Sequence, residues 1–175
     1  DYLLSQRKRL GTLPQSPIII KTIVSTDLIY DIAKDYNAQV IDVLTGFKFI
    51  GEKIGLLESK GEVDRFVFAF EESYGYLAGP YVRDKDGVVA AMLVAEMAEF
   101  YLNQDKTLVD RLEEIYEHYG YHTSVQKSLE FKGIEGSQEM NHKIDAIRNN
   151  PPSTLGKYEV KQFKDYLKGI DDLPA

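Results

Sequence analysis

The chain has 175 residues, enough for one domain or for one domain and part of another. Its formal net charge of −7 disfavours nucleic acid or an anionic membrane surface as the main partner, so neither is expected. Cysteine is absent, which excludes a disulfide framework and a thiolate zinc site. No apolar run approaches the roughly 20 residues of a membrane-spanning helix, and no signal-peptide pattern opens the chain, so we expect a cytoplasmic protein.

The N-terminal residues are expected to form the end of a helix and a linker. Asp1–Leu10 carries basic residues where a last helical turn would lie, and Gly11 is a typical stop signal. The stretch GTLPQSP that follows is typical of a linker. Because the chain starts inside a helical pattern without methionine and stops without a finished element, we expect an excised fragment. Residues 1–16 would then belong to a preceding domain.

Residues 17–120 alternate between strand and helix patterns. The predicted elements are a strand over Ile18–Ser25, a helix over Leu28–Tyr36 capped by Thr26 and Asp27, a strand over Gln39–Leu44, a helix over Phe47–Ser59 and a strand over Arg65–Phe70. Strands that alternate with helices favour an α/β fold, here a three-layer α/β/α domain with a largely parallel sheet.

Two further helices are predicted after the third strand. Val88–Leu102 is apolar on most faces, so we expect it to lie deeply buried against the sheet. Leu108–Tyr119 is amphipathic and ends before Gly120, which closes the predicted domain.

Residues 121–175 differ in character and are expected to form the incomplete start of a second, α+β domain. The patterns predict an exposed strand over Tyr121–Phe131, a helix from Gly136 to Arg148 and a short strand over Tyr158–Tyr166. A lone strand–helix–strand unit buries its apolar faces poorly. Its unpaired edge at Tyr158–Tyr166 could pair with a second copy, which makes a homodimer one expected assembly.

The stretch with the chemistry of a ligand site is Phe70–Gly87, FEESYGYLAGPYVRDKDG. It joins a strand to a helix, the place where open α/β sheets bind ligands. Its candidate ligand groups are two adjacent carboxylates, a hydroxyl, three tyrosines and the cation just before the predicted helix, namely Glu71, Glu72, Ser73, Tyr74, Tyr76, Tyr81 and Lys85. Carboxylates accept hydrogen bonds from paired hydroxyls and a lysine beside helix amides attracts phosphate, so the set suits a polyhydroxylated anion. A solvated surface loop would have the same residue types.

Three strand-to-helix loops are expected to meet at one edge of the sheet, because the carboxyl ends of parallel strands lie together. These loops are Ser25–Leu28, Leu44–Lys48 and Phe70–Gly87. The chain has no P-loop, GxGxxG, nucleophile elbow or HExxH motif. His118 and His122 would share a helix face only if Gly120 did not break the helix, so no metal site is predicted.

Acid–base chemistry would have to come from a lysine or a carboxylate. Lys85 stands between Asp84 and Asp86, which favour its charged form, whereas a catalytic base needs a lowered pKa. The residues by themselves therefore favour a solvated Lys85, with Asp86 as the N-cap of the next helix.

Taken together, FEESYGYLAG, the following RDKDG and the apolar helix resemble the sugar-binding loop of the α-D-phosphohexomutases, the superfamily of phosphoglucomutase and phosphomannomutase. KTIVSTDL (Lys21–Leu28) and LTGFKFIG (Leu44–Gly51) occur in the same order and at similar spacing in that superfamily. The resemblance runs across most of the chain. It implies a four-domain parent, with the end of the second domain in residues 1–16, the third domain in 17–120 and the start of the fourth in 121–175.

The resemblance also implies roles for individual residues. Glu71 and Ser73 would bind the 3- and 4-hydroxyls of the sugar, and Lys85 matches a lysine proposed as general acid/base. The loop thought to distinguish sugar orientation would comprise Thr45, Gly46 and Phe47. The implied partners are a phosphosugar substrate and the other domains of the parent chain.

The implied reaction interconverts hexose 1-phosphate and hexose 6-phosphate through a phosphoserine, with hexose 1,6-bisphosphate as activator and Mg²⁺ as cofactor of the parent. Neither the phosphoserine loop nor the Asp-x-Asp-x-Asp magnesium loop occurs in this chain, so the fragment alone is expected to be inactive. A non-catalytic module that binds a sugar phosphate or nucleotide, or a protein-interaction domain, remains an alternative. The preferred sugar is left open.

Overall fold

The computed structural model describes residues 1–125 and 128–168. The chain divides into one unit from Asp1 to Ser124 and a second from Val125 onward. Within the described ranges, no helix has the length and apolar character needed to cross a membrane.

The first unit is built on a four-stranded sheet with the order β2-β1-β3-β4. Its strands are β1 (Ile18–Thr22), β2 (Gln39–Val43), β3 (Phe66–Glu71) and β4 (Gly75–Leu77). The central strand β1 reads IIIKT and is buried throughout, as β-branched residues favour. It runs parallel to both β2 and β3, and only β4 is antiparallel. The predicted α/β fold with a largely parallel sheet is confirmed.

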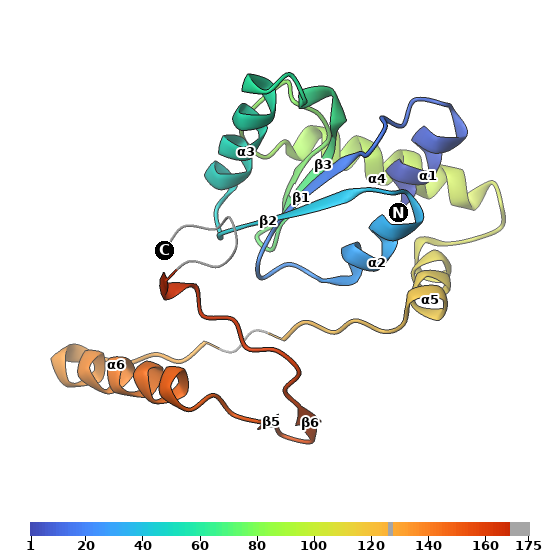
Figure 1. Cartoon of the computed structure of the whole chain (residues 1–175). Helices are drawn as coiled ribbons and strands as arrows, with labels where there is room; N and C mark the ends of the chain where they lie inside the picture. Colours follow the sequence, from blue (N-terminus) through green and yellow to red (C-terminus); the bar gives the residue numbers. More distant parts are fainter. Residues whose placement is uncertain (126–127, 169–175) are drawn as a thin grey trace. The chain divides into compact units, whose positions relative to one another are not determined.

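Helices cover both faces of the sheet (Figure 1). On one face lies α3 (Phe47–Ser59), whose Ile50 and Ile54 are fully buried against β1 and β3. On the other face lie α1 (Tyr2–Arg9) and α2 (Leu28–Asp35), with Leu4 and Ile32 in a second apolar cluster. Burial of one such side chain stabilises the fold by about 1.5–3 kcal/mol, so these two clusters hold the layers together.

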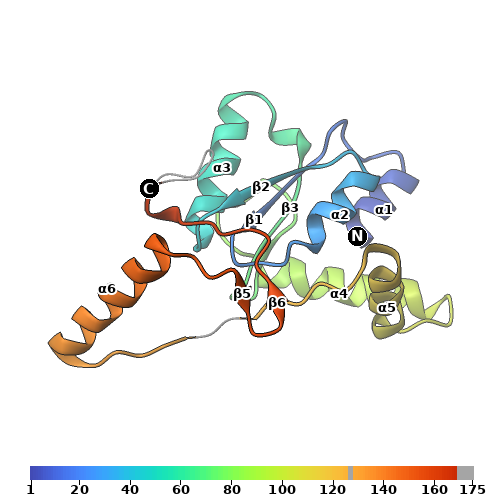
Figure 2. The same ribbon diagram turned by 60° about the horizontal axis from the view of Figure 1, so that its bottom comes forward.

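Helix α4 (Gly87–Leu102) is less buried than predicted, with Tyr101 as its one buried residue. Val88 and Met92 are 72% and 66% exposed. The helix contacts β4 and α5 (Leu108–Tyr119), beside which it lies in Figure 2. The prediction of deep burial was wrong: within the first unit α4 packs mainly against α5 and against β4, which has only three residues, and much of the helix surface stays exposed.

Two local features differ from prediction in the first unit. A hairpin joins β3 to β4, which residue patterns missed because β4 is so short. Asp27 is the N-cap residue of α2, but its side chain makes no cap hydrogen bond and lies 3.0 Å from the buried Lys21 amine, while Thr26 Oγ1 accepts from the Leu28 amide. A short 3₁₀ turn, Val63–Arg65, leads into β3.

The second unit contains α6 (Gly133–Asn149), a hairpin of β5 (Thr154–Leu155) and β6 (Tyr158–Glu159), and a 3₁₀ turn at Tyr166–Lys168. The described part of Tyr121–Phe131 forms no strand, and residues 126–127 of that prediction lie outside the described residues. The strand predicted over Tyr158–Tyr166 shrinks to two residues, since its polar sequence has no apolar layer to cover it. The homodimer remains a prediction, but it was based on a strand edge over Tyr158–Tyr166 that is much shorter in the structure.

Candidate functional site

The residues predicted to form a site lie together at the edge of the sheet where β1, β2 and β3 end. An open hollow of about 550 Å³ is lined there by Thr45, Gly46, Phe47, Lys48, Glu71, Glu72, Ser73, Asp84 and Lys85. All six residues to which the resemblance gave roles are in this set, as is Glu72, whereas Tyr74, Tyr76 and Tyr81 of the predicted ligand loop do not line the hollow. Their side chains come from three places: the end of β3, the start of α3 and the loop before α4.

Glu71 is the buried carboxylate of the site, with a side chain that is 3% exposed. Its Oε1 accepts hydrogen bonds from Ser73 Oγ at 2.7 Å and from Lys85 Nζ at 2.8 Å. Burial by itself would raise the pKa of Glu71, but these two donors outweigh it and hold the pKa below its ordinary value. Glu71 is therefore an ionised hydrogen-bond acceptor at neutral pH.

Lys85 faces the hollow with a side chain that is 46% exposed. Its hydrogen bond to Glu71 raises its pKa above the ordinary value, and the charges of Glu71, Asp84 and Glu72 act in the same direction. Lys85 is thus a cation that can donate a proton or bind an anion. As placed here, it is not a base.

The hairpin between β3 and β4 presents Glu71 and Ser73. Its three-residue turn ends in Tyr74, whose φ of 57° is left-handed, as the last residue of such turns requires. Gly75 follows and pairs with Glu71 across the hairpin. A Cβ on Gly75 would lie 2.6 Å from Glu71 Cγ and 2.9 Å from the Phe47 ring. The glycine therefore lets the Glu71 side chain pack between the hairpin and the start of α3.

The loop that carries Lys85 is held against α3 and β4. A Cβ on Gly51 would lie 2.5 Å from the Arg83 carbonyl oxygen, so this glycine lets the loop backbone approach the helix. Further along α3 toward its C-terminal end, Glu58 Oε2 lies 2.6 Å from Arg83 Nη2. The Asp86 amide donates to the Tyr76 carbonyl of β4 at 2.8 Å. These contacts bring a residue 14 positions away in sequence next to Glu71.

Asp86 is the N-cap of α4, as predicted. Its Oδ1 accepts from the Val88 and Val89 amides, and its Oδ2 accepts from the Tyr81 hydroxyl at 2.8 Å. The Val89 amide and the Tyr81 hydroxyl lower the pKa of Asp86. This cap fixes where the loop ends and leaves Lys85 one residue before the helix cap.

The first strand-end loop joins the site through residues that sequence analysis did not single out. Thr22 Oγ1 donates to Glu72 Oε2 at 2.8 Å, and Thr22 Oγ1 lies 2.7 Å from Ser25 Oγ. The amine of Lys21 beneath them is fully buried. The signal available in the sequence was the polar pair Lys21-Thr22 after three isoleucines, but a strand predicted to Ser25 placed Thr22 inside it, whereas β1 ends at Thr22.

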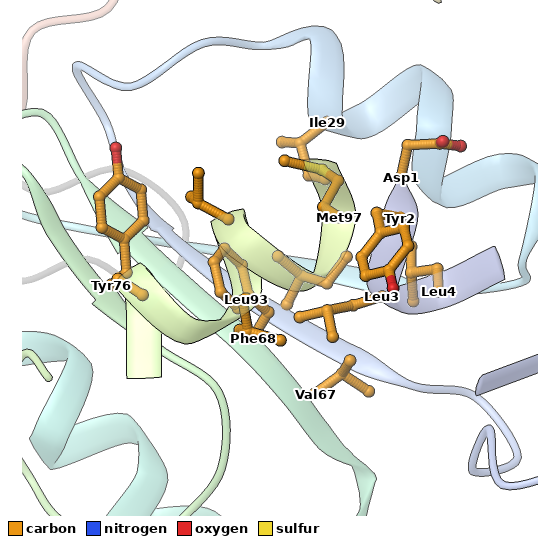
Figure 3. Close-up of a pocket in the computed structure, with 13 residues that line it drawn as sticks. Asp1, Tyr2, Leu3, Leu4, Ile29, Val67, Phe68, Tyr76, Leu93 and Met97 are labelled. Atoms are coloured by element: carbon orange, nitrogen blue, oxygen red, sulfur yellow. The ribbon is translucent and has the colours of Figure 1, made fainter. Parts of the chain in front are cut away.

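A second hollow, of about 320 Å³, lies between α4, α1 and the sheet (Figure 3). Its walls are apolar side chains such as Leu4, Phe68, Leu93 and Met97. It marks where α4 incompletely covers the sheet. Its lining also includes Asp1, Tyr2 and Tyr76, but the Asp1 carboxylate already pairs with Arg111 and the Tyr2 hydroxyl already donates to Glu96, so this mostly apolar hollow does not suit a sugar phosphate.

The described residues do not fit a metal ion, since they contain no group of three or more His, Asp or Glu side chains placed to hold one. The two histidines considered from the sequence lie near separate aspartates of α2: His118 Nε2 is 3.4 Å from Asp35, and His122 Nε2 is 3.3 Å from Asp31. The carboxylate of Glu71 at the candidate site is already paired with a cation.

The geometry thus defines an α/β/α domain with a polar hollow, the candidate site, at the carboxyl ends of its strands. Residues 1–119 match the family model described as phosphoglucomutase/phosphomannomutase, alpha/beta/alpha domain III. Phosphoglucomutases of Staphylococcus aureus are similar over 167 residues, with 38% identity in strain USA300 and 37% in strain MRSA252. Each alignment covers 95% of this chain and 29% of the relative.

A crystal structure from Thermus thermophilus, described as that of a phosphomannomutase, has a similar fold. The TM-score is 0.51 at 20% identity, over 67% of this chain and 24% of the other. The chain belongs to the phosphoglucomutase/phosphomannomutase family. It spans less than a third of the length of the curated relatives named above.

Proposed function

We propose that this chain is the sugar-recognition part of a cytoplasmic mutase that interconverts hexose 1-phosphate and hexose 6-phosphate. The observation that carries the proposal is that Glu71, Ser73 and Lys85 share one hydrogen-bonded cluster in a chain of this family. The cluster lines the same hollow as Thr45 and Phe47.

The chemistry of each group supports a role in orienting a sugar. Glu71 is an ionised acceptor, and Ser73 can both donate and accept, so the pair matches two neighbouring sugar hydroxyls, proposed to be those at carbons 3 and 4. The protonated Lys85 can donate to an oxygen of the substrate, which favours a role as general acid or anion anchor at the start of the reaction. Thr45, Gly46 and Phe47 would form the wall that senses the sugar's orientation.

The phosphoryl-transfer groups are proposed to come from the rest of a longer protein. A phosphoserine would give its phosphoryl group to the sugar and take the other one back, with the hexose 1,6-bisphosphate as intermediate and activator. Mg²⁺ would supply charge neutralisation during the transfer and would be held outside this chain. The other partners of this chain are therefore the remaining domains and the phosphosugar.

A coupled assay that follows glucose 1-phosphate to glucose 6-phosphate, with magnesium and the bisphosphate present, tests the proposal. We expect turnover by the full-length protein that contains this sequence and none by the 175-residue chain. In the full-length protein, Glu71→Ala should lower kcat/KM by about 10- to 100-fold, because one or more charge-assisted hydrogen bonds to the sugar are lost.

Glu62→Ala is the matched control, because Glu62 also pairs with a cation, Arg65, but at the opposite end of β3. Its kcat/KM should stay within about twofold of the wild-type value, since exposed ion pairs contribute little. Multiple turnovers by the isolated chain, or equal losses in the two variants, would contradict the proposal.

A further inference from the structure

The hairpin turn of the candidate site contains a carboxylate to which the resemblance gave no role. Glu72 stands between the two proposed sugar ligands, Glu71 and Ser73. It is an exposed residue, yet its Oε2 accepts a hydrogen bond at 2.8 Å from the hydroxyl of Thr22, a residue with 0% exposure that lies 50 positions earlier.

The hydrogen bonds around Thr22 have a defined direction. A carboxylate only accepts hydrogen bonds, so the single hydroxyl hydrogen of Thr22 goes to Glu72. The hydroxyl of Ser25, 2.7 Å away, then donates to Thr22 Oγ1. The result is a chain of donors from Ser25 through Thr22 to Glu72, in which each bond polarises the next.

The turn that contains Thr22 and Ser25 is held in place by the buried amine of Lys21. Lys21 Nζ is fully buried and donates to the carbonyl oxygens of Thr22 and Ser25 at 3.3 and 3.2 Å. The same amine lies 3.0 Å from Asp27 and 3.2 Å from Asp42. A buried cation with four oxygen partners within 3.3 Å fixes the turn, so Thr22 offers its hydroxyl from a rigid position.

From this geometry we infer that Glu72 is a positioning residue of the sugar site. β1 and β3 are neighbours in the sheet, and Lys21 pairs with Phe70, so the two strands end side by side. The Thr22–Glu72 bond ties the hairpin turn to the end of β1 at the point between Glu71 and Ser73. It thereby fixes the backbone from which both sugar ligands project. The inference rests on the proposed function for its kinetic readout but not for its structural one.

The structural readout is amide hydrogen exchange of residues 72–75 in the 175-residue chain. Thr22→Val keeps the side-chain shape and removes the hydroxyl together with its bonds to Glu72 and Ser25. Because only the bond to Glu72 reaches the hairpin, we expect exchange of these amides to become roughly fivefold faster, as for the loss of one hydrogen bond. Thr22→Ser keeps the hydroxyl and should restore the wild-type rates. Thr26→Val is the control, since Thr26 belongs to the same turn but bonds to the Leu28 amide.

The kinetic readout is taken in the full-length protein. Thr22→Val and Glu72→Ala should each raise KM for glucose 1-phosphate several-fold while the urea midpoint changes little, and Thr22→Ser should have the wild-type KM. Unchanged exchange at residues 72–75 in Thr22→Val, or unchanged KM in both variants, would overturn the inference. If the wild-type protein shows no mutase activity, the proposed function fails, whereas the exchange rates still decide whether Thr22 and Glu72 hold the hairpin.

Discussion

Lys85 Nζ lies 2.8 Å from Glu71 Oε1 and pairs a half-exposed cation with a carboxylate that is 3% exposed. Each group fixes the charge of the other: the pKa of Lys85 is raised and that of Glu71 is lowered. A sugar that binds here must share or replace these hydrogen bonds. The pair thus keeps the buried acceptor ionised and oriented before any ligand arrives.

The pH dependence of stability should report this pair. The pKa of Glu71 lies below its ordinary 4.5, so the pair's contribution is present above about pH 4.5 and is lost as the pH falls through the folded pKa. The pKa of Lys85 lies above 10.5, so the contribution is present below that pH and is lost as the pH rises through the folded pKa. In Lys85→Met the buried Glu71 has lost its cation, and its pKa should rise.

Urea unfolding of the chain and of its Lys85→Met variant at several pH values measures this effect. The variant should be less stable than wild type at pH 7, and the gap should shrink as the pH falls, because Glu71 without its cation takes up a proton at a higher pH than it does in the wild type. Lys161→Met removes the partner of Glu159, an ion pair whose two side chains are 80% and 69% exposed, and should show almost no gap. A gap for Lys85→Met that stays constant from pH 7 to pH 4 would show that the pair does not govern the charge of Glu71.

Gly75→Ala should damage the site more than the fold. The new Cβ would meet Glu71 Cγ and the Phe47 ring, so the Glu71 carboxylate must move away from Ser73 and Lys85. Overpacking of this kind costs about 1–3 kcal/mol in free energy of unfolding. We expect loss of at least about tenfold in kcat/KM of the full-length protein. Gly55→Ala is the control, because nothing lies within 4 Å of a Cβ there. A wild-type kcat/KM in Gly75→Ala would show that Glu71 does not take part in the site.

The packing of α3 sets the stability of the layer that carries Thr45 and Phe47. Ile50 has 0% exposure in the cluster between α3 and the sheet, so Ile50→Ala should lower the free energy of unfolding by about 2–5 kcal/mol. Leu56 is in the same helix but 46% exposed, and Leu56→Ala should cost less than about 1 kcal/mol. Equal losses in urea unfolding would contradict the placement of α3.

Elements with strong periodicity were predictable from the sequence. The run of β-branched residues from Ile18 and the helical spacing of Phe47, Ile50 and Ile54 predict by themselves that these side chains are buried, as they are in the structure. The convergence of two strand-end loops also followed, since parallel strands end at one edge. The exposure of α4 did not follow, because apolar composition does not tell which side of a helix has a neighbour.

Contacts between distant residues could not be predicted in the same way. The bond from Thr22 to Glu72 depends on which strands are neighbours and on where β1 ends, and both are properties of the assembled sheet. Likewise, Asp84 and Asp86 suggested a solvated Lys85, whereas the hairpin brings Glu71 to it. The direction of the pKa shift of Lys85 was deducible from its neighbours, but the partner that dominates it was not.

Deoxygenated substrates test the central claim, that Glu71 recognises the sugar's hydroxyl groups. The measurement is kcat/KM of the full-length protein and of its Glu71→Ala variant for glucose 1-phosphate and for its 3-deoxy and 4-deoxy analogues. We predict that removing at least one of these hydroxyls lowers kcat/KM of the wild type by about tenfold or more but lowers kcat/KM of Glu71→Ala by less than about twofold. The penalty disappears in the variant because the hydroxyl that is removed is the one that the Glu71 carboxylate would bind. Equal penalties for both proteins with both analogues would show that Glu71 does not contact these hydroxyls and would contradict the account.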